Sequence, residues 1–516
     1  MKLNKRLLYT GCILSSVSLI AIATLLDGCK SNKPGKVYKL TTDTIADGKN
    51  LAQMHCTKCH SLVPVDALTK DVWTMHALPA MAKYLSIATY GADYYKKEGD
   101  TTGLSLQEWQ RIVNYYKTLA PDTLAAAKPP VPLQNDWAGF ELKKSKPTSE
   151  ISFTTLAAFN PANGKIYTSD VMGSDLTEWV NYKPVRTAKL PSPAVHANFG
   201  IDSAAAGQFM LSSIGRLDNV DFPNGRIVKA YAGNAGIIKT KDEYTELPRP
   251  VQTLNADFDK DGKSELVVLG QGHLHGGVYV FKTNGAGALQ QFATVSDKPG
   301  AVQAVAGDFN SDGWLDIMVL YGVNDESLTL YLNNKKGGFT AKDLLRFPPV
   351  SGSTSFQLTD IDHDGQPDLI YTCGYNFRDS RILKPYHGMY IYKNTGNFDF
   401  KQSWFYPING CTKAIAADFD RDGDIDIASI AFFADMKNKP AEEFIYFEQN
   451  AAMKFTPHAI PVSQYGRWMT LDVNDVNKDG KPDIILGNYA SGFLFQPNFE
   501  PAWDEHMPFI VLQNNH

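Results

Sequence analysis

The sequence predicts a multidomain protein in which a small all-α unit precedes an all-β propeller of seven blades. Three features of the 516-residue chain support this fold class. Residues 43–121 contain helical patterns, residues 122–137 form a proline-rich linker, and residues 138–516 repeat an acidic turn between apolar runs. A repeat of about 50 residues is typical of propeller blades. The two parts are therefore expected to fold as separate units.

Residues 1–28 have the pattern of an export signal. Basic residues precede an apolar run that ends at Leu26, and this order is typical of a secretory signal peptide. The run continues into "LLDGCKSN", which resembles a bacterial lipobox with Cys29 as the lipidated residue. The resemblance implies a lipid anchor in the cell envelope, at the periplasmic or surface face of the outer membrane, with residues 29–42 as a tether. An uncleaved membrane anchor is the alternative.

The stretch "MHCTKCHSL" places two residues between Cys56 and Cys59, and His60 follows at once. A zinc site would need a second pair of ligands, and the chain contains no second C-x-x-C. A redox motif of the thioredoxin type expects a βαβ context, whereas the flanks here have helical patterns. C-x-x-C-H is the attachment pattern of c-type haem. One covalent haem c is therefore predicted, with His60 as an iron ligand and a redox cysteine pair as the alternative.

The second axial ligand of such an iron is often methionine, which raises the redox potential. Met81 is the favoured candidate, because it lies 21 residues after His60 in "LPAMA", a proline-containing turn that is expected to cross the far side of the haem. Met75 and His76 are the alternatives.

A helix is predicted over residues 105–120. Ser105 and Glu108 form a capping box at its start, the apolar residues from Trp109 to Tyr116 repeat at helical spacing, and Pro121 follows. With the C-x-x-C-H motif, this helix makes residues 43–121 resemble a small class I cytochrome c domain. The resemblance implies a carrier of single electrons.

Five copies of a D-x-[DN]-x-D-G-x-x-[DE] turn follow in the second part of the chain, each before an apolar β run. Their first aspartates lie 51, 52, 58 and 57 residues apart. Oxygen ligands of this kind suit Ca²⁺, and glycine at position six permits a tight turn. An EF-hand would close with glutamate at position twelve, whereas here the closing acid is at position nine. Solvated Asp-Gly turns are the alternative.

The turns predict up to five Ca²⁺ ions. The predicted ligands are Asp257, Asp259, Asp261, Glu265, Asp308, Asn310, Asp312, Asp316, Asp360, Asp362, Asp364, Asp368, Asp418, Asp420, Asp422, Asp426, Asp475, Asn477, Asp479 and Asp483. These repeats resemble the FG-GAP/VCBS family of integrin-like propellers. The resemblance implies that the ions are structural clips between the two inner strands of a blade, with no catalytic role.

Residues 138–516 divide into seven blades at this period. The first two, around "LAAFNPANGKIYTSD" and "HANFGIDSAAAGQFMLSS", lack the carboxylates and are predicted to bind no calcium. The last blade has no fourth strand of its own, and "AGFELKKSKP" (residues 138–147) matches the fourth-strand pattern. We expect this segment to complete the last blade and close the ring.

Cys373 and Cys411 are predicted to form a disulfide. Cys373 ends a strand in one blade and Cys411 begins the first strand of the next, so both are expected on the face opposite the acidic turns. An exported chain permits such a bridge. Two buried free thiols are the alternative.

These features predict an exported, lipid-anchored electron-transfer protein whose propeller docks a redox partner protein or a surface ligand. The long loops opposite the acidic turns, including residues 373–388 and the histidines His273 and His275, are the expected binding surface. No catalytic residues are predicted, because the common catalytic motifs are absent, and the net charge of −5 does not favour nucleic acid. One alternative is a quinohaemoprotein-like dehydrogenase of sugars or alcohols. Another is a glycan- or nutrient-binding lipoprotein of an outer-membrane uptake system.

Overall fold

The computed structural model describes residues 38–91, 93–200, 207–218, 221–233, 236–285, 287–376, 382–491 and 499–516. The predicted signal peptide and Cys29, the predicted lipidation site, lie outside these ranges. Among the described residues, no helix is both long and apolar enough to cross a membrane.

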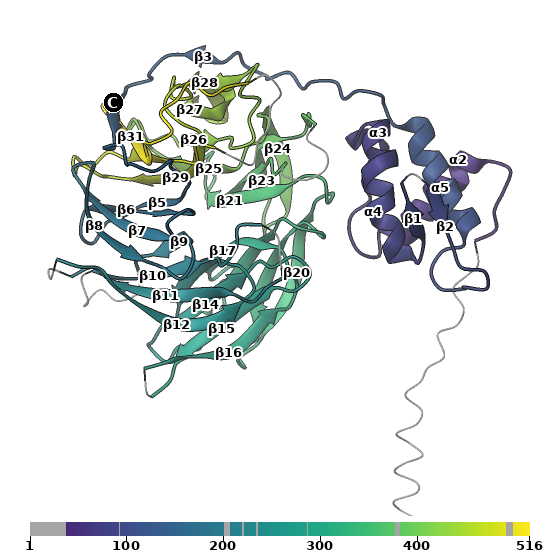
Figure 1. Ribbon diagram of the computed structural model, residues 1–516, viewed down its shortest axis with the longest axis horizontal. Coiled ribbons are helices and arrows are strands. Elements are labelled where there is room, and N and C mark those ends of the chain that lie inside the picture. The colour runs from purple at the N-terminus through teal and green to yellow at the C-terminus, as the bar shows by residue number, and fades with distance from the viewer. Residues whose placement is uncertain are drawn as a thin grey trace, which may run out of the picture.

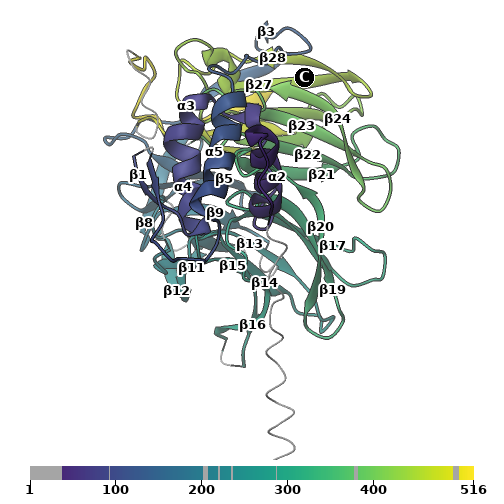
Figure 2. The same cartoon turned by 90° about the vertical axis from the view of Figure 1, so that its right-hand side faces the viewer.

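The first part of the chain folds into a helical unit beside the propeller (Figure 1, Figure 2). Two longer helices pack against each other, and shorter turns and a small hairpin complete the unit. The hairpin is a departure from the all-α prediction. The elements are α2 (Thr44–Cys56), a 3-10 turn (Val65–Ala67), α3 (Lys70–Val72), a π-helical turn (Trp73–Ala77), α4 (Leu78–Ala82), a 3-10 turn (Lys83–Leu85), β1 (Ala88–Tyr90), β2 (Asp93–Tyr95) and α5 (Leu106–Leu119).

Helix α5 begins and packs as its sequence predicts. The Ser105 hydroxyl oxygen accepts a hydrogen bond from the Glu108 N–H at 3.1 Å, and the Glu108 carboxylate accepts one from the Ser105 N–H at 2.9 Å. Trp109, Ile112 and Tyr116 are buried in the core of the unit. The capping box and the apolar face are therefore confirmed.

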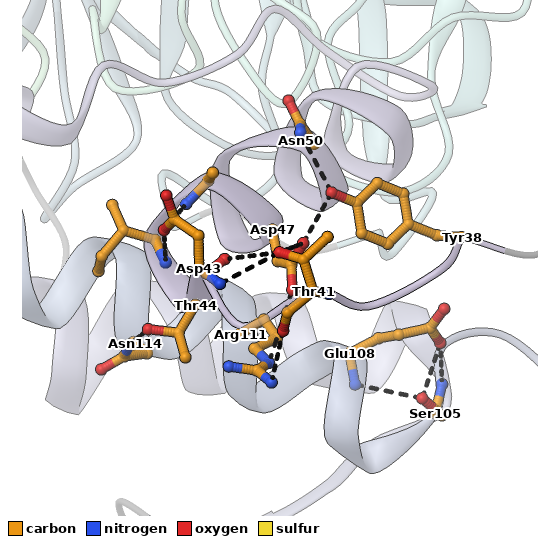
Figure 3. Close-up of polar contacts among 12 residues, drawn as sticks. Tyr38, Thr41, Asp43, Thr44, Asp47, Asn50, Ser105, Glu108, Arg111 and Asn114 are labelled. Atoms are coloured by element: carbon orange, nitrogen blue, oxygen red, sulfur yellow. Dashed lines mark hydrogen bonds and ion pairs between the residues drawn. The ribbon is translucent and has the colours of Figure 1, made fainter.

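Helix α2 crosses α5 at Gly48, where a Cβ would lie 2.2 Å from the Arg111 carbonyl oxygen. Only glycine permits this approach. Next to the crossing, the buried Asp47 carboxylate accepts hydrogen bonds from the Thr41 N–H at 2.8 Å and the Tyr38 hydroxyl at 3.0 Å (Figure 3). Burial would raise the pKa of Asp47, but these hydrogen bonds and the Arg111 charge hold it below its usual value. The first helix is thereby fixed to the last.

A π-helical turn precedes Pro79 in the run from α3 to α4. Proline lacks an N–H and clashes with the carbonyl four residues earlier in a regular helix. The wider π turn accommodates the ring. Met81 follows in α4. It lies on a helix, so the prediction of a turn at this residue is wrong.

The second part of the chain is a seven-bladed all-β propeller (Figure 1). Each blade is built on four antiparallel strands, to which blade 6 adds a fifth, and the first strands of neighbouring blades contact one another around the axis. Blades 1 and 2 contain β5 (Thr154–Asn160), β6 (Lys165–Asp170), β7 (Asp175–Val180), β8 (Lys183–Lys189), β9 (Ala194–Asn198), β10 (Gln208–Ser213), β11 (Gly225–Tyr231) and β12 (Lys239–Leu247).

Blades 3 to 5 follow the same order and carry the first three acidic turns between their first and second strands. Their strands are β13 (Pro250–Ala256), β14 (Glu265–Gly270), β15 (Gly277–Thr283), β16 (Leu289–Ser296), β17 (Ala301–Gly307), β18 (Asp316–Tyr321), β19 (Ser327–Asn333), β20 (Phe339–Arg346), β21 (Ser353–Thr359), β22 (Asp368–Cys373), β23 (Gly388–Asn394) and β24 (Phe400–Pro407).

Blades 6 and 7 also take strands from the segment that precedes blade 1. Blade 6 contains β25 (Lys413–Ala417), β26 (Asp426–Ile430), β27 (Phe444–Ala451) and β28 (Lys454–Ala459), with a 3-10 turn (Pro440–Glu443) before β27 and β3 (Gln134–Asn135) at its edge. Blade 7 contains β29 (Trp468–Asn474), β30 (Asp483–Asn488), β31 (Phe509–Asn514) and β4 (Phe140–Lys144).

Strand β4 closes the ring by pairing antiparallel with β31, from Phe140 opposite Asn514 to Lys144 opposite Ile510. The predicted closure is therefore confirmed. The preceding segment is not a free linker along its whole length, because β3 pairs parallel with β28 and Asp136 lies 2.8 Å from His458 Nδ1. Strand β28 would otherwise be an exposed edge of blade 6 with unpaired backbone groups, and β3 covers part of that edge.

A polar side chain from the innermost strand of each blade bonds to the backbone of the next innermost strand. In blades 3 to 5, Gln252, Gln303 and Gln357 each donate to one residue of the next blade and accept from it, at 2.7–3.1 Å. The other four bonds are Thr155 Oγ1 to the Ala194 carbonyl (2.7 Å), the Thr253 N–H to His196 Nδ1 (3.5 Å), Lys413 Nζ to the Leu471 carbonyl (2.8 Å) and the Phe159 N–H to Asp472 Oδ2 (2.8 Å). These bonds link all seven blades.

The helical unit contacts blade 5 on the face opposite the acidic turns. The Tyr386 hydroxyl donates to the Ala67 carbonyl at 3.1 Å, and Val350 and Ile382 pack against the helical core. The loop of residues 373–388, predicted to receive a partner, therefore packs on the helical unit of the same chain. Residues 377–381 of this loop lie outside the described residues.

Deleting residues 136–148 is expected to abolish cooperative unfolding of the propeller, because β31 loses its partner and the ring opens. The measurement is thermal unfolding followed by circular dichroism. Deleting residues 125–129, in the connecting segment before β3, is the control and should leave the transition in place. An unchanged melting curve for the first deletion would contradict the role of β4.

Candidate metal centres and the thiol–imidazole turn

The five acidic turns share one backbone geometry. The glycine at position six has φ between +80° and +99° in all five, a conformation that glycine adopts without strain. The carboxylate at position five accepts from the N–H at position seven at 2.8–2.9 Å in every turn. In four turns the first aspartate accepts from the glycine N–H at 2.8–3.0 Å; these are Asp257, Asp308, Asp360 and Asp475. These bonds give the five turns the same compact form.

Three of the turns bring carboxylate oxygens within 4.8 Å of one another. These groups are Asp257, Asp259, Asp261 and Glu265 in blade 3, Asp360, Asp362 and Asp368 in blade 5, and Asp418, Asp420 and Asp422 in blade 6. Four of their oxygens are buried without a hydrogen-bond partner, namely Asp257 Oδ1, Asp362 Oδ1, Asp368 Oδ2 and Asp418 Oδ1. Buried carboxylate oxygens are costly unless a cation or donor meets them. Hard oxygen donors in this number fit Ca²⁺.

The turns of blades 4 and 7 carry asparagine at position three. The Asn310 amide donates to the Asp312 carboxylate at 3.1 Å, and the Asn477 amide donates to Asp479 at 2.9 Å. Each of these turns has one negative charge fewer at this position than the others. We therefore expect a weaker attraction for a divalent cation in these two blades.

The closing acid at position nine is almost fully buried in all five turns. In blade 4, one oxygen of Asp316 accepts from the Phe309 N–H in the turn at 3.1 Å, and the other accepts from the Asn333 N–H of the third strand at 2.8 Å. The same pair of bonds recurs at Asp426 and Asp483. Burial raises the pKa of these acids, to about 6 for Asp426. The closing acid therefore ties the turn to the third strand, a role that the sequence analysis missed.

Lysines from the third strands reach two of the turns. In blade 3 the Lys282 ammonium contacts Asp259 and lies 3.6 Å from Glu265. In blade 5 the Lys393 ammonium lies 3.0 Å from Asp364. An ammonium among the carboxylates competes with a bound cation. The sequence signal was a lysine directly before the last residue of the third strand, and it was overlooked.

Blade 6 differs from blades 3 and 5 at this position. Ile427 pairs with Phe447 as Leu266 pairs with Phe281, so Glu448 occupies the place of Lys282. The blade 6 turn therefore combines three gathered aspartates with no lysine at this place. We expect it to be the strongest calcium site of the five.

Amide side chains at the ends of third strands tie neighbouring blades together at the turns. Asn333 Nδ2 of blade 4 donates to the Phe258 carbonyl, at position two of the blade 3 turn, at 2.9 Å. The same contact joins Gln449 to the Ile361 carbonyl at 3.2 Å and Asn514 to the Phe419 carbonyl at 2.7 Å. The conformation of one turn is thereby coupled to the next blade.

The C-x-x-C-H motif forms a compact turn at the end of α2. The N–H groups of Cys59 and His60 lie 3.3 and 3.4 Å from the Cys56 carbonyl oxygen. Both thiols are free, and Cys59 is exposed. His60 Nδ1 lies 2.7 Å from the Ser61 carbonyl oxygen, so a hydrogen on Nδ1 bonds to that carbonyl and the Nε2 lone pair is left for a metal. Two thiols and one imidazole nitrogen on a single turn fit a covalently attached haem.

The helical unit exposes several large apolar side chains. Met54, Met75 and Met81 are 42%, 47% and 36% exposed, and the unit also exposes Tyr84, Tyr90, Tyr95 and Leu119. Large exposed apolar surface often marks a binding site, and a porphyrin is a group that would cover such surface. Met75, Met81 and His76 all have exposed side chains, so none of these candidate ligands is committed to the core.

The structure does not contain the predicted disulfide, since Cys373 and Cys411 are free and buried. The Cys373 thiol is directed to the Tyr386 carbonyl oxygen at 3.3 Å. Burial raises the pKa of both thiols, and the nearby Cys373 raises that of Cys411 further. The prediction that Cys373 and Cys411 lie in neighbouring blades is correct. The direction of the Cys373 thiol, however, depends on its contact with the loop after β22.

The histidines of "GQGHLHGG" do not gather with other ligands within the described part of the chain. Instead, the Asp221 carboxylate accepts the backbone N–H groups of His273, Leu274 and His275 at 2.7–3.0 Å. The backbone N–H groups of this loop therefore donate to a carboxylate of blade 2.

Comparisons with known proteins bear on the propeller. An FG-GAP-like repeat model matches residues 257–319 and 308–371, which span the acidic turns of blades 3 to 5. FG-GAP-like repeats are therefore present in this chain. The comparison with curated proteins gives no match.

Similar solved structures share little sequence with this chain. A protein from Lactobacillus plantarum is 12% identical over 60% of this chain and 86% of its own, with a TM-score of 0.40. The dihydro-heme d1 dehydrogenase NirN is 12% identical over 85% and 92%, with a TM-score of 0.38. The protein BBS1N in complex with ARL6DN is 10% identical over 73% and 97%, with a TM-score of 0.44.

Chelating calcium with EDTA is expected to lower the melting temperature of the propeller. When the free calcium concentration is about 100 times the dissociation constant, binding stabilises the folded state by about 2.7 kcal/mol per site. Calorimetry should show the propeller transition move while that of the helical unit stays. The variant Asp418→Asn should reduce the shift and Asp399→Asn, outside the turns, should not. A propeller transition that ignores EDTA would count against calcium in these turns.

Replacing Lys393 with methionine is expected to tighten calcium binding in blade 5. The lysine is partly exposed, and exposed ion pairs contribute about 0.2–1 kcal/mol, so the affinity should rise by up to roughly fivefold. Calcium titration calorimetry measures the change. Lys401→Met is the matched control, because Lys401 pairs with Asp399 at 3.3 Å in the same blade, away from the turn. Unchanged or weaker binding in Lys393→Met would refute the competition.

Proposed function

We propose that this protein is an exported, lipid-anchored electron-transfer protein in which residues 43–121 carry one covalent haem c. The propeller holds this unit and offers a docking platform to a redox partner or a surface ligand. The observation that carries the proposal is the turn of Cys56, Cys59 and His60, with both thiols free and His60 Nδ1 engaged by the Ser61 carbonyl.

The residues of the helical unit have distinct tasks in this proposal. Cys56 and Cys59 hold the porphyrin through thioether bonds, and His60 Nε2 ligates the iron. Bound haem supplies a one-electron couple. The Nδ1 hydrogen bond fixes the plane and tautomer of the His60 ring, and Met81 gives a thioether ligand that raises the potential.

The propeller restrains the position of the helical unit. The contacts of Tyr386, Val350 and Ile382 with the helical core support a fixed orientation of the electron-carrying unit relative to blade 5. The calcium turns lie at the opposite face, where bound ions would stiffen the blades. A partner that recognises the propeller would then meet the helical unit in a defined position.

Covalent haem is tested by expressing the exported chain with a haem-attachment system and recording the pyridine haemochrome spectrum and the intact mass. The wild type should carry one haem per chain. Cys56→Ala with Cys59→Ala should lose it entirely, because no thioether bond can form. Cys411→Ala is the matched control and should keep it. A wild-type chain without covalent haem would end the proposal.

Met81 is expected to be the second iron ligand. Met81→Ala should remove the weak near-infrared charge-transfer band of oxidised His/Met haem, lower the midpoint potential and open the iron to added ligands. Absorption spectra and a redox titration measure these changes. The same changes in Met75→Ala, with a silent Met81→Ala, would show that Met75 is the ligand.

A further inference from the structure

A cavity of about 640 Å³ runs along the propeller axis. The innermost strands of all seven blades line it, from residues at their first positions, such as Lys413, to residues at their last positions, such as Asn474. Cavities of this size hold small organic molecules. Neither the haem turn nor the calcium turns form part of its wall.

Three of the side chains that link the innermost strands also face this cavity and are titratable: His196, Lys413 and Asp472. In blades 3 to 5 the same task is done by glutamines, whose amide groups both donate and accept. A neutral amide is therefore sufficient to join two blades. Lys413 and Asp472 bring charges that the ring itself does not need.

Lys413 has more N–H donors than its hydrogen bonds to the protein use. Its ammonium donates one hydrogen bond, to the Leu471 carbonyl at 2.8 Å, while an ammonium carries three N–H groups. Within the described ranges, no ion pair within 4 Å includes Lys413. Its side chain is only half-buried although it stands inside the ring, so the remaining N–H groups face the cavity.

His196 offers a second donor. Its Nδ1 faces the Thr253 N–H at 3.5 Å and accepts from it, which places the ring hydrogen on Nε2. Burial, with the Lys413 charge adding to it, lowers the pKa of His196 to about 4, so the ring is neutral at pH 7. His196 of blade 2 and Lys413 of blade 6 both line the cavity.

The charge and the walls of the cavity specify the ligand. Lys413 brings a positive charge and Asp472 a negative charge to the wall, while the charge of Arg249 acts on the nearby Asp218. The N–H donors of Lys413 and His196 suit the oxygen atoms of an anion. Asp472 Oδ2 is already occupied by the Phe159 N–H and the Asn474 amide. Apolar side chains make up much of the remaining wall, among them Val251, Val302, Phe432 and Phe433.

We propose that the axial cavity binds a small organic monocarboxylate with an apolar body. The carboxylate accepts from Lys413 Nζ and His196 Nε2, and the body lies against the apolar wall. This site is independent of haem and of calcium, and its ligand is recognised by charge-assisted hydrogen bonds.

The test is titration calorimetry of the full chain, in calcium-containing buffer, with benzoate as the probe. Benzamide and benzylamine have the same ring with a neutral and a cationic group. Benzoate should bind one-to-one, benzamide at least about tenfold more weakly, and benzylamine not at all. Benzoate that fails to saturate, or that binds no better than benzamide, overturns the proposal. Tight benzylamine binding that Asp472→Asn removes also overturns it.

Lys413→Gln separates the charge from the link between blades. Glutamine at this place can bond to the next blade as Gln252 and Gln303 do from the same register position, so the melting temperature should stay close to that of the wild type. Benzoate binding should weaken by roughly 10- to 100-fold, as loss of a hydrogen bond to a charged group predicts. Unchanged benzoate binding in the folded variant refutes the role of Lys413.

Gln357→Met is the matched control, because it removes a link of the same ring without removing a charge. It should lower the melting temperature and leave benzoate binding within about twofold. If Lys413→Gln does not fold, His196→Gln takes its place, with the same expected direction and the same refuting result.

Discussion

The propeller depends on the pairing of β4 with β31. These strands come from the two ends of the propeller sequence, so the pairing bears the entropic cost of closing the largest loop in the chain. Once it forms, every innermost strand has a neighbour on both sides, and the ring of polar side chains can link all seven blades. Without this pairing, Asp472 of blade 7 and Phe159 of blade 1 would not be brought within hydrogen-bond distance. The cavity, the array of turns and the surface under the helical unit all require a closed ring.

The acidic turns show how a folded protein tolerates many carboxylates in a small space. Each position-nine acid is buried, and Asp316, Asp426 and Asp483 accept backbone N–H groups from both the turn and the third strand. In blades 3 and 6 the acids at positions one, three and five lie close together, and in blade 3 the Lys282 ammonium lies among them. Because Asn333, Gln449 and Asn514 join these turns to the next blade, local charge balance reaches across blade boundaries.

The helical unit is built around a close crossing of its first and last helices. Gly48 permits the approach, and the buried Asp47 carboxylate gathers donors from the segment before α2. This arrangement holds the end of α2, and with it Cys56, Cys59 and His60, in a fixed place. The loop that carries Tyr386 then restrains the whole unit against blade 5. The thiol–imidazole turn is therefore positioned by two sets of contacts, the crossing of α2 with α5 and the contact of the helical unit with blade 5.

The sequence by itself determined the elements whose signal is local. Glycine at position six, the spacing of the acids, the capping box of Ser105 and Glu108, and the fourth-strand pattern of residues 138–147 each depend on short-range backbone chemistry, and the structure contains all of them. Only the tertiary structure decided where long-range contacts direct a side chain. The Cys373 thiol is directed to a carbonyl, the position-nine acids are turned to the third strands, and lysines reach the turns. It also decided that His196, Lys413 and Asp472, which are far apart in the chain, share one cavity. Ring closure brings these residues together, and no local pattern encodes which side chains will meet across an axis.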